Sequence, residues 1–265
     1  MNTEAPIIEV EGVVAHYGQR EVLKGIDLAV DDGEIMVIMG GSGSGKSTLL
    51  NHLLGLLRPS RGTVRLLGRD INRLPAMELL ELRRRMGVAF QSGALFSSLT
   101  VAENILLPLR EHTDLDEHTM AIIARLKLEV VSLSGFGDLM PAELSGGMVK
   151  RAALARAIVM DPKLLFCDEP TAGLDPVVSS SIDQLILRLR DALGMTIVVV
   201  THDLDSAFRI ADRICVLEEG RVIAIGSKDE IRSSGSERVQ NLLNRRSKEV
   251  TLDPDAYLRR LFGEG

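Results

Sequence analysis

Short apolar runs alternate along the chain with longer segments in which apolar residues recur at helical spacing. The clearest runs are IIEVEGVVAHY, EIMVIMG, GVAFQ, LLFCDE and TIVVVTH, followed by the neighbouring pair RICVLEEG and RVIAIG. They are rich in β-branched residues and nearly continuous in apolar character, which is typical of strands buried on both faces. Such strands separated by helices predict an α/β fold built on a parallel sheet.

Two segments depart from this alternation. From about Ser92 to Met160 the pattern indicates three or four helices and no strand, so we predict a helical subdomain inserted into the α/β core. After Gly226 the composition changes, and a Ser/Gly break is followed by short amphipathic patterns around Leu242 and Leu258. This part of the chain is predicted to be a C-terminal appendage.

A glycine-rich sequence, GGSGSGKST, lies between the predicted strand EIMVIM and the predicted helix STLLNHLLGLL. It fits G-x-x-x-x-G-K-[ST], and this strand-to-helix context favours a phosphate-binding loop over an ordinary turn. Its glycines let successive N–H groups face a phosphate, Lys46 reaches the β and γ oxygens, and the Ser47 hydroxyl can ligate Mg²⁺. The predicted nucleotide-binding residues are Gly40, Gly41, Ser42, Gly43, Ser44, Gly45, Lys46, Ser47 and Thr48.

The strand LLFCDE ends in two carboxylates. In a protein with a phosphate-binding loop, Asp168 is expected in the magnesium shell, and Glu169 is placed to orient and deprotonate an attacking water. The alternative is a strand end that simply reaches solvent. The phosphate-binding loop disfavours it.

Polar side chains also follow three other predicted strands. His202 ends TIVVVTH, at the edge of an α/β sheet where ligands bind, so we expect it to contact the γ-phosphate or Glu169. Gln91 ends GVAFQ at the entrance to the helical insert and is expected to touch Mg²⁺ or the attacking water. Tyr17 follows the first strand, where stacking on adenine competes with a place in the core.

The run LSGGMVKRAALARA opens a predicted helix with Ser145, Gly146 and Gly147. None of its side chains is expected to take part in chemistry, but the free N–H groups of a helix start attract an anion. One phosphate-binding loop holds one nucleotide, and the helical insert is a separate lobe. We therefore expect these three residues to cap the γ-phosphate held by the loop of a second chain.

Composition narrows the function classes. The chain has 265 residues, a net charge of −6 and no broad basic face, so we expect no nucleic-acid partner. The basic run Arg83–Arg85 falls where a helix should end before a strand, and cations are favourable there.

Cys167 and Cys215 lie inside apolar strands and are expected to be reduced core residues. No apolar run approaches the roughly 18 residues of a membrane span, so a membrane role requires a partner.

In combination, these motifs resemble those of the ATP-binding cassette (ABC) transporter ATPases, from Ile7 to about Leu243. The phosphate-binding loop, Gln91, LSGG, LLFCDE, AGLDP and His202 occur in that family's order and spacing. The resemblance implies a RecA-like P-loop NTPase core with an antiparallel β part and the inserted α-helical subdomain. The domain would cover residues 7–243, followed by an extension over 244–265.

The resemblance also implies ATP and Mg²⁺ as cofactors and ATP hydrolysis coupled to transport. Two chains would form a head-to-tail homodimer around two ATP molecules, each site combining one chain's phosphate-binding loop with the other's LSGG. Asp175, in AGLDP, looks like the family's aspartate that couples the two sites. The implied partner is an integral membrane permease, with the chain on the cytoplasmic face of the inner membrane.

Within the family, FQSGALFSSLTVAENILLPLRE and LMPAELSGGMVKRAALARA look like the ATPase of MCE-linked phospholipid transporters, the Mla type. Met148 stands where most importer ATPases carry a glutamine. The resemblance adds an MCE protein and a small cytosolic accessory subunit as partners. The sequence EPTAGLDP, however, is the form found generally in importer ATPases. The alternative to a phospholipid transporter is therefore another ABC importer or a lipoprotein-release system. A non-transport ABC protein would need a coiled-coil insertion or a second cassette, and this sequence has neither.

A short apolar patch follows Gln91, on a lobe otherwise rich in charge. It consists of Leu95, Phe96 and Leu99. Exposed apolar patches often mark partner sites, so we expect a socket for a cytoplasmic helix of the permease. The alternative is that Phe96 belongs to the insert's own core.

The last residues, 247–265, carry an apolar set at helical spacing after an Asp-Pro-Asp start: Tyr257, Leu258, Leu261 and Phe262. A helix this short is stable only when its apolar face is docked. Its docking surface is either the chain's own core or a neighbour, the second ATPase chain or a small cytosolic partner. The Mla-type ATPases carry a similar extension, and the resemblance implies that it reaches across to the other protomer.

Overall fold

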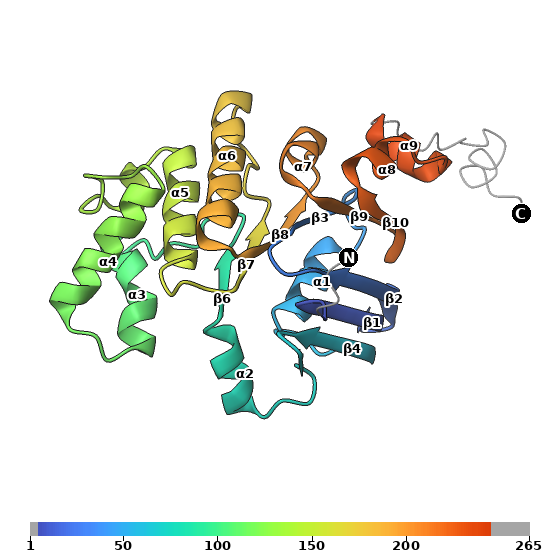
Figure 1. Ribbon diagram of the computed structural model, residues 1–265, viewed down its shortest axis with the longest axis horizontal. Helices are drawn as coiled ribbons and strands as arrows, with labels where there is room; N and C mark the ends of the chain where they lie inside the picture. The colour runs from blue at the N-terminus through green and yellow to red at the C-terminus, as the bar shows by residue number, and fades with distance from the viewer. Residues whose placement is uncertain (1–4, 245–265) are drawn as a thin grey trace, which may run out of the picture.

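The computed structural model describes residues 5–244, which form two sheets flanked by helices (Figure 1). The first sheet is antiparallel, in the order β2-β1-β4-β5, and comprises β1 (Ile8–Tyr17), β2 (Arg20–Val30), β4 (Arg61–Leu66) and β5 (Arg69–Asp70). The second has the order β10-β9-β3-β8-β7-β6 and comprises β3 (Ile35–Met39), β6 (Met86–Ala89), β7 (Leu164–Asp168), β8 (Thr196–Thr201), β9 (Arg213–Glu218) and β10 (Arg221–Ser227). Its strands are parallel except for β10, which pairs antiparallel with β9.

Helices flank the two sheets (Figure 1). In chain order they are α1 (Lys46–Leu53), α2 (Ala76–Arg83), α3 (Val101–His112), α4 (Glu117–Val130), the 3-10 turn η1 (Pro141–Glu143), α5 (Gly146–Ala157), α6 (Pro176–Leu193), α7 (Leu204–Ile210), α8 (Lys228–Arg232) and α9 (Glu237–Leu243). In Figure 1, α3, α4 and α5 form a lobe at one end of the molecule, and the antiparallel sheet lies toward the other.

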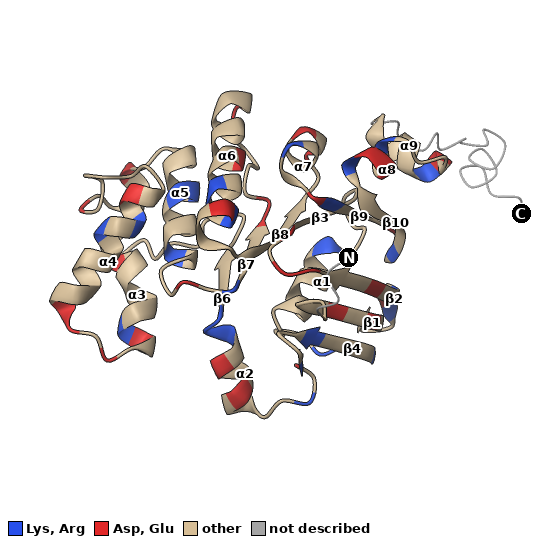
Figure 2. Ribbon diagram, viewed as in Figure 1, with Lys and Arg blue, Asp and Glu red and all other residues tan. Residues whose placement is uncertain are grey.

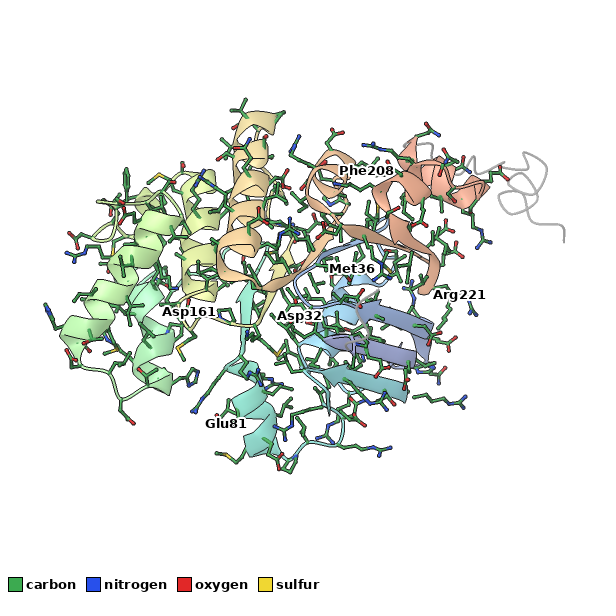
Figure 3. All side chains as sticks on the ribbon, viewed as in Figure 1. Asp32, Met36, Glu81, Asp161, Phe208 and Arg221 are labelled. Atoms are coloured by element: carbon green, nitrogen blue, oxygen red, sulfur yellow. The ribbon has the colours of Figure 1, made fainter. Side chains whose placement is uncertain are left out.

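The central strands are continuous in apolar residues because each serves two cores. In β3, Ile35, Val37 and Met39 face the core shared with the helical lobe, α6 and α7. Met36 and Ile38 face a second core, between this sheet, α1 and the antiparallel sheet. Met36 is labelled near the middle of Figure 3, among these packed side chains. Alternate residues of one strand point to opposite faces, so a strand between two cores needs no polar position.

The predicted α/β fold is confirmed. One strand that the hydrophobic pattern assigned to the parallel sheet lies elsewhere. The run IIEVEGVVAHY does not join the parallel sheet. It forms β1 of the antiparallel sheet, paired with β2 and β4. The strands β2 and β4 were not predicted, because exposed and buried residues alternate along much of β2 and because β4 is a short strand that begins Arg-Gly-Thr and has only two buried residues.

Between β6 and β7 the chain forms α3, α4, η1 and α5, and no strand lies within residues 92–160. A buried asparagine fixes the entrance to this lobe. Asn104 is fully buried on α3; its Oδ1 accepts from the Phe96 N–H at 2.7 Å, and its Nδ2 donates to the carbonyls of Phe96, Leu99 and Thr100. The segment that leads from Gln91 into the lobe is therefore held to α3 by three hydrogen bonds, two at Phe96 and one at Leu99, and the fourth lies at the helix N-cap.

Both cysteines are buried core residues, as expected. Burial raises the pKa of the Cys167 thiol and of the Cys215 thiol to about 12, which keeps them protonated and unreactive at neutral pH. The basic run does close a helix, since α2 ends at Arg83 and β6 begins at Met86.

Over residues 5–244, no helix combines the length and apolar character needed to cross a bilayer. Lys and Arg are interspersed with Asp and Glu along the ribbon in Figure 2. The predicted tail helix with Tyr257, Leu258, Leu261 and Phe262 lies outside the described residues, and its docking stays a prediction.

Candidate active site

The predicted site residues meet at one edge of the parallel sheet. Parallel pairing places Met39 of β3 beside Thr201 of β8, and Asp168 of β7 beside Val200 of β8. The carboxyl ends of three adjacent strands therefore finish almost level, and the loops that follow them share one edge. In sheets of this kind, that edge is where ligands bind.

The glycine-rich loop joins β3 to α1, as predicted. Gly45 is the N-cap of α1 with φ 107°, a conformation that favours glycine, and a Cβ there would lie 2.9 Å from Leu23 Cδ2. At Gly40 a Cβ would clash with the carbonyl oxygen of Leu217. No side chain caps α1, so the N–H groups of its first turn remain available to an anion.

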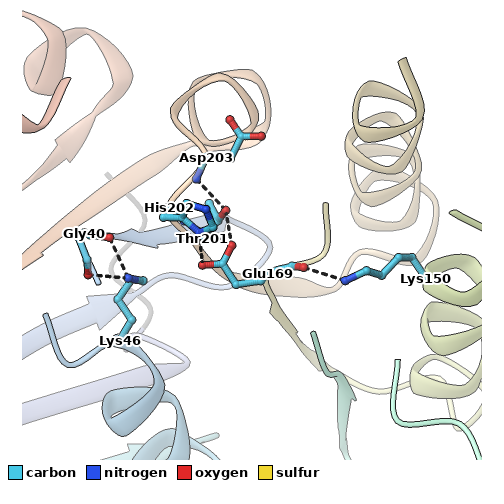
Figure 4. A network of polar contacts seen from close by, with 8 residues as sticks. Gly40, Lys46, Lys150, Glu169, Thr201, His202 and Asp203 are labelled. Atoms are coloured by element: carbon cyan, nitrogen blue, oxygen red, sulfur yellow. Dashed lines mark hydrogen bonds and ion pairs between the residues drawn. The ribbon is translucent and has the colours of Figure 1, made fainter. Parts of the chain in front are cut away.

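Lys46 lies inside this loop. Its Nζ donates to the carbonyl oxygens of Gly40 at 2.8 Å and Gly41 at 2.9 Å, and the residue is 9% exposed (Figure 4). Burial lowers the pKa of Lys46, while the nearby Glu169 and Asp168 carboxylates act in the opposite direction. The Ser44 hydroxyl, also buried, has no hydrogen-bond partner among the described residues. The loop thus presents an ammonium, an unpaired hydroxyl and free backbone donors, which fit a nucleotide's phosphates.

Glu169 follows β7 in the left-handed conformation, with φ 47°, which is strained for a residue with a side chain. Its N–H donates to the Val200 carbonyl at 2.8 Å. Its Oε1 lies 2.7 Å from His202 Nδ1, and its Oε2 accepts from Thr201 Oγ1 at 3.0 Å. The expected contact between His202 and Glu169 is present in the structure. The expected contact of His202 with a γ-phosphate stays a prediction.

The three predicted magnesium ligands offer a carboxylate, a hydroxyl and an amide, all hard oxygen donors of the kind Mg²⁺ prefers. Asp168 ends β7, and burial followed by repulsion from Glu169 raises its pKa, against the attraction of Lys150 and Lys46. Asp168 and Gln91 line one groove. Ser47 lies one residue after Lys46 on α1 and is exposed. These donors fit Mg²⁺.

Ser145, Gly146 and Gly147 lie at the start of α5, as predicted. Ser145 is the N-cap, and its Oγ accepts from the Met148 N–H at 3.4 Å. None of the described residues that line the two clefts at the glycine-rich loop comes from this helix start. Gly147 has a second, intrachain role, because a Cβ there would lie 2.6 Å from Val178 Cγ1 on α6.

Two further predicted residues lie at element ends. Asp175 is the N-cap of α6, where its Oδ1 accepts from the N–H groups of Val177 and Val178 at 3.0 Å. Tyr17 ends β1 and is 53% exposed, so the core alternative for this tyrosine is wrong. Its stacking on adenine stays a prediction.

Sequence reasoning missed Lys150. The expectation that no side chain of LSGGMVKRAALARA takes part in chemistry stays a prediction, but it gave no reason to look for a side chain of this run at the site. Lys150 is 8% exposed, and its Nζ donates to the carbonyls of Gln91 at 2.5 Å and Glu169 at 3.0 Å. A lysine close to the glycines of the helix start was the available signal, but its acceptors are distant in sequence.

The comparisons with known proteins agree with this geometry. The family model described as ABC transporter matches residues 23–172, which include the glycine-rich loop, Gln91, LSGG and Glu169. This chain belongs to the ABC transporter family. It is an ATP-binding subunit of an ABC transporter, an ATPase whose hydrolysis of ATP is coupled to transport.

Two groups of relatives resemble this ABC ATPase along most of its length. It is 45% identical to the intermembrane phospholipid transport system ATP-binding protein MlaF of Haemophilus influenzae, covering 89% of this chain and 90% of the relative. MlaF of Escherichia coli K12 is 40% identical over 91% of this chain. The probable ribonucleotide transport ATP-binding protein mkl of Mycobacterium leprae is 41% identical over 90% of this chain and 69% of its own length.

Solved structures show the same fold. The ATP-binding cassette MJ0796, as a dimer in a post-hydrolysis state bound to ADP and Pi, has a TM-score of 0.77 and 34% identity, covering 83% of this ABC ATPase and 98% of that chain. The cbiO1 protein of Clostridium perfringens, part of the ABC transporter complex cbiONQ, has a TM-score of 0.81 and 33% identity, covering 97% of this chain.

Proposed function

We propose that this ABC ATPase powers the movement of phospholipid by a transporter that works with an MCE protein. The observation that carries the proposal is its similarity to MlaF, which extends over about nine tenths of both chains. Two sequence features support the same phospholipid-transporter subtype. They are the sequence SGALF after Gln91 and Met148 in place of the usual glutamine.

The mkl relatives favour a second candidate, ribonucleotide transport, at nearly the same identity. Their similarity spans about two thirds of the mkl chain, against 90% of MlaF. We therefore rank phospholipid first. A different ABC importer or a lipoprotein-release system is the remaining alternative.

In the reaction we infer, Glu169 accepts the proton of the water that attacks the γ-phosphate. His202 and Thr201 fix its carboxylate from both sides, so it is oriented before substrate arrives. Lys46 binds the β and γ oxygens. Asp168, Ser47 and Gln91 would hold Mg²⁺, which neutralises phosphate charge when bound. Tyr17 would stack on the adenine.

We infer a head-to-tail homodimer with two shared sites. The helix start at Ser145–Gly147 has the free N–H groups of an anion site, yet it lines neither cleft at its own chain's glycine-rich loop. In Figure 1, α5 lies in the helical lobe, and α1 lies on the other side of β7 and β8. A second chain could bring the two together, with Asp175 at the junction. The dimeric state of the similar cassette MJ0796 supports this arrangement.

The motor requires a membrane permease as a partner, and we place the chain on the cytoplasmic face of the inner membrane. An MCE protein and a small cytosolic accessory subunit complete the proposed system. ATP binding would close the dimer, and hydrolysis with phosphate release would reopen it. The helical lobe would pass this motion to the permease.

The deciding experiment is purification of the chain from its native membrane in mild detergent, identification of the proteins that copurify, and reconstitution of the complex into vesicles. We expect a permease and an MCE protein, and ATP-dependent transfer of labelled phospholipid between vesicles. The Glu169→Gln complex is the matched control and should not transfer lipid. Stimulation of hydrolysis by ribonucleotides other than ATP, with no lipid transfer, would support the second candidate instead.

A further inference from the structure

Lys150 joins two parts of the active site that come from different strands. Its Nζ donates to the carbonyl oxygen of Gln91, after β6, at 2.5 Å and to that of Glu169, after β7, at 3.0 Å. Figure 4 shows the side chain reaching from α5 to the main chain of Glu169, on the side away from Lys46. Its acceptors are therefore the backbones of the predicted base and of a predicted magnesium ligand.

The hydrogen bonds of Lys150 form in a buried position and not on the surface. Lys150 is 8% exposed, and a buried ammonium is costly unless it is hydrogen-bonded. Burial lowers the pKa of Lys150, while the carboxylates of Glu169 and Asp168 attract its charged form. Hydrogen bonds that involve a charged donor are stronger than neutral ones, so the two carbonyls are held firmly.

The backbone of Glu169 needs such a restraint. Its left-handed φ of 47° is unfavourable for a residue with a side chain, and persists only where the surroundings fix it. The N–H is fixed by Val200 and the carboxylate by Thr201 and His202. Lys150 holds the carbonyl side. A shift of the peptide would change the direction of the carboxylate, and errors of about 1 Å in catalytic placement cost on the order of 100-fold in rate.

The same helix also holds the turn after Gln91. Arg156 donates to the carbonyls of Gly93 at 3.0 Å and Ala94 at 2.7 Å. Gly93 packs so closely on Val149 that a Cβ would lie 2.7 Å from its Cγ1. Residues 91–94 are thus coupled to α5 at several points, and Lys150 is the point that reaches Glu169 as well.

Lys150 also lies one turn from the glycines of the helix start. It is four residues after Gly146 and three after Gly147, so these residues share one side of α5. A displacement of the helix start along α5 therefore moves the ammonium that holds Glu169.

We propose that Lys150 is a positioning residue, through which the helix that begins at Ser145 sets the backbones of Gln91 and Glu169 in its own chain. The inference rests on the proposed function where it assigns Ser145–Gly147 to the nucleotide of a second chain. In that dimer, Lys150 connects the half-site that a chain offers to its partner with the half-site in which its own Glu169 works. Contact with one ATP then adjusts the base acting on the other.

The first test compares Lys150→Met and Lys150→Gln with Lys150→Arg in the full-length chain. Because positioning affects the chemical step, we expect kcat for ATP to fall about 100-fold in both variants without the ammonium. KM should stay within about threefold of wild type, since the phosphate contacts remain. Lys150→Arg, which keeps charged donors, should recover most of the lost kcat.

The matched control is Arg151→Met, which removes a neighbouring cation from the same helix. Arg151 donates to the Val131 carbonyl and to Ser181, outside the site, so its loss lowers stability without the same loss of kcat. Thermal unfolding of every variant separates folding from turnover. The proposal is wrong if Lys150→Gln folds and turns over ATP as fast as Arg151→Met, or if only KM changes.

The second test uses mixed dimers in which one chain carries Glu169→Gln and the other keeps its base. We expect Lys150→Met to reduce turnover when it lies in the chain with the intact Glu169, and to leave it within about twofold when it lies in the other chain. The reverse dependence would mean that Lys150 serves only the helix start, and would overturn the proposal.

Ser145→Asp is the reference in the same mixed dimers. It should stop turnover from the chain that lacks the base, because that chain's helix start would face the working site. If Ser145→Asp acts only from the chain with the intact Glu169, the shared site is wrong. The positions at which Lys150→Met and Ser145→Asp act therefore separate failure of this inference from failure of the proposed dimer.

Discussion

The Nδ1 atom of His202 lies 2.7 Å from Oε1 of Glu169, and the other carboxylate oxygen, Oε2, accepts from Thr201 Oγ1 at 3.0 Å (Figure 4). Both partners come from the end of β8, the strand next to β7. The carboxylate is therefore fixed at two points by the adjacent strand. A base that is already oriented loses no rate to reorganisation when the nucleotide binds.

The first prediction is that Glu169→Gln keeps ATP binding but loses turnover. The amide keeps the shape and hydrogen-bonding capacity of the side chain but cannot accept the proton, so hydrolysis should fall by about 10²- to 10⁴-fold. ATP should then hold the dimer closed, which size-exclusion chromatography with ATP would detect. Glu129→Gln, on the exposed surface of α4, is the matched control. Wild-type turnover in Glu169→Gln would remove Glu169 from its role.

The second prediction is that His202 acts through Glu169. If the imidazole orients the base, His202→Ala should lower kcat in a chain with Glu169, while the double variant with Glu169→Gln should be no slower than Glu169→Gln alone. Residues that act as one unit are strongly non-additive in this way. Single-turnover hydrolysis measures all three variants. Losses that multiply would show that His202 acts on the phosphate independently.

The sequence was most informative where function depends on local backbone. GGSGSGKST defines a strand, a loop and a helix by itself, and the structure has β3, the loop and α1 in those places. The apolar strands were equally clear, because β3, β7 and β8 are buried on both faces. Their shared edge then brings Asp168, Glu169 and His202 together.

Contacts between distant residues could not be predicted in the same way. The role of Lys150 depends on hydrogen bonds to two carbonyls, 59 and 19 residues away in sequence, which come together only in the folded sheet. β2 was missed because its alternation of exposed and buried positions is weaker evidence for a strand than a continuous apolar run. The close packing of Gly147 on Val178 within the chain could not be predicted either, because the LSGG motif already gave a reason for a glycine at this position.

The third prediction concerns the shared site. Ser145→Asp should nearly abolish hydrolysis and leave ATP binding by the glycine-rich loop unchanged, because aspartate still caps α5 but repels a γ-phosphate. Ser145→Asn, also a good N-cap but neutral, is the matched control. Gly147→Glu would bring the same charge to the helix start, but a Cβ at Gly147 would lie 2.6 Å from Val178 Cγ1, so that variant would also disturb the packing of α5 on α6.

Mixing Ser145→Asp chains with Lys46→Ala chains gives the direct readout. Each mixed dimer would contain one intact site, made from the wild-type loop of one chain and the wild-type helix start of the other. Hydrolysis should therefore reappear on mixing. If each site lay within one chain, every site in the mixture would carry one defect and activity would stay absent.

The fourth prediction is that Asn104→Ala destabilises the helical lobe. The change removes the side-chain partner of the Phe96 N–H and of the Leu99 carbonyl, while the carbonyls of Phe96 and Thr100 each lose one of two donors and keep a backbone N–H. It also empties a fully buried position on α3, and we expect a loss of about 2–4 kcal/mol in the free energy of unfolding. Asn104→Asp should cost at least as much, because it sets a carboxylate against those carbonyls. Urea unfolding measures both. A change below about 0.5 kcal/mol would show that the turn does not depend on Asn104.

The last prediction is that Phe96 contacts the permease. Phe96 is 54% exposed although its backbone is fixed by Asn104, so the alternative in which it belongs to the insert's own core is wrong. The predicted patch is smaller than the sequence indicated, because Leu95 packs against the core and Leu99 is half-buried. A large aromatic side chain held outward on a rigid turn is suited to a partner's apolar surface.

Phe96→Ala should therefore weaken recovery of the permease complex and uncouple transport from hydrolysis. The isolated subunit should keep ATP binding and change its unfolding free energy by less than about 0.5 kcal/mol, as an exposed position allows. Phe136→Ala is the matched control, since Phe136 is 41% exposed on the same lobe, in the turn after α4. Equal recovery of the complex with both variants would place the permease on another surface, and equal loss with both would mean that the whole lobe contributes.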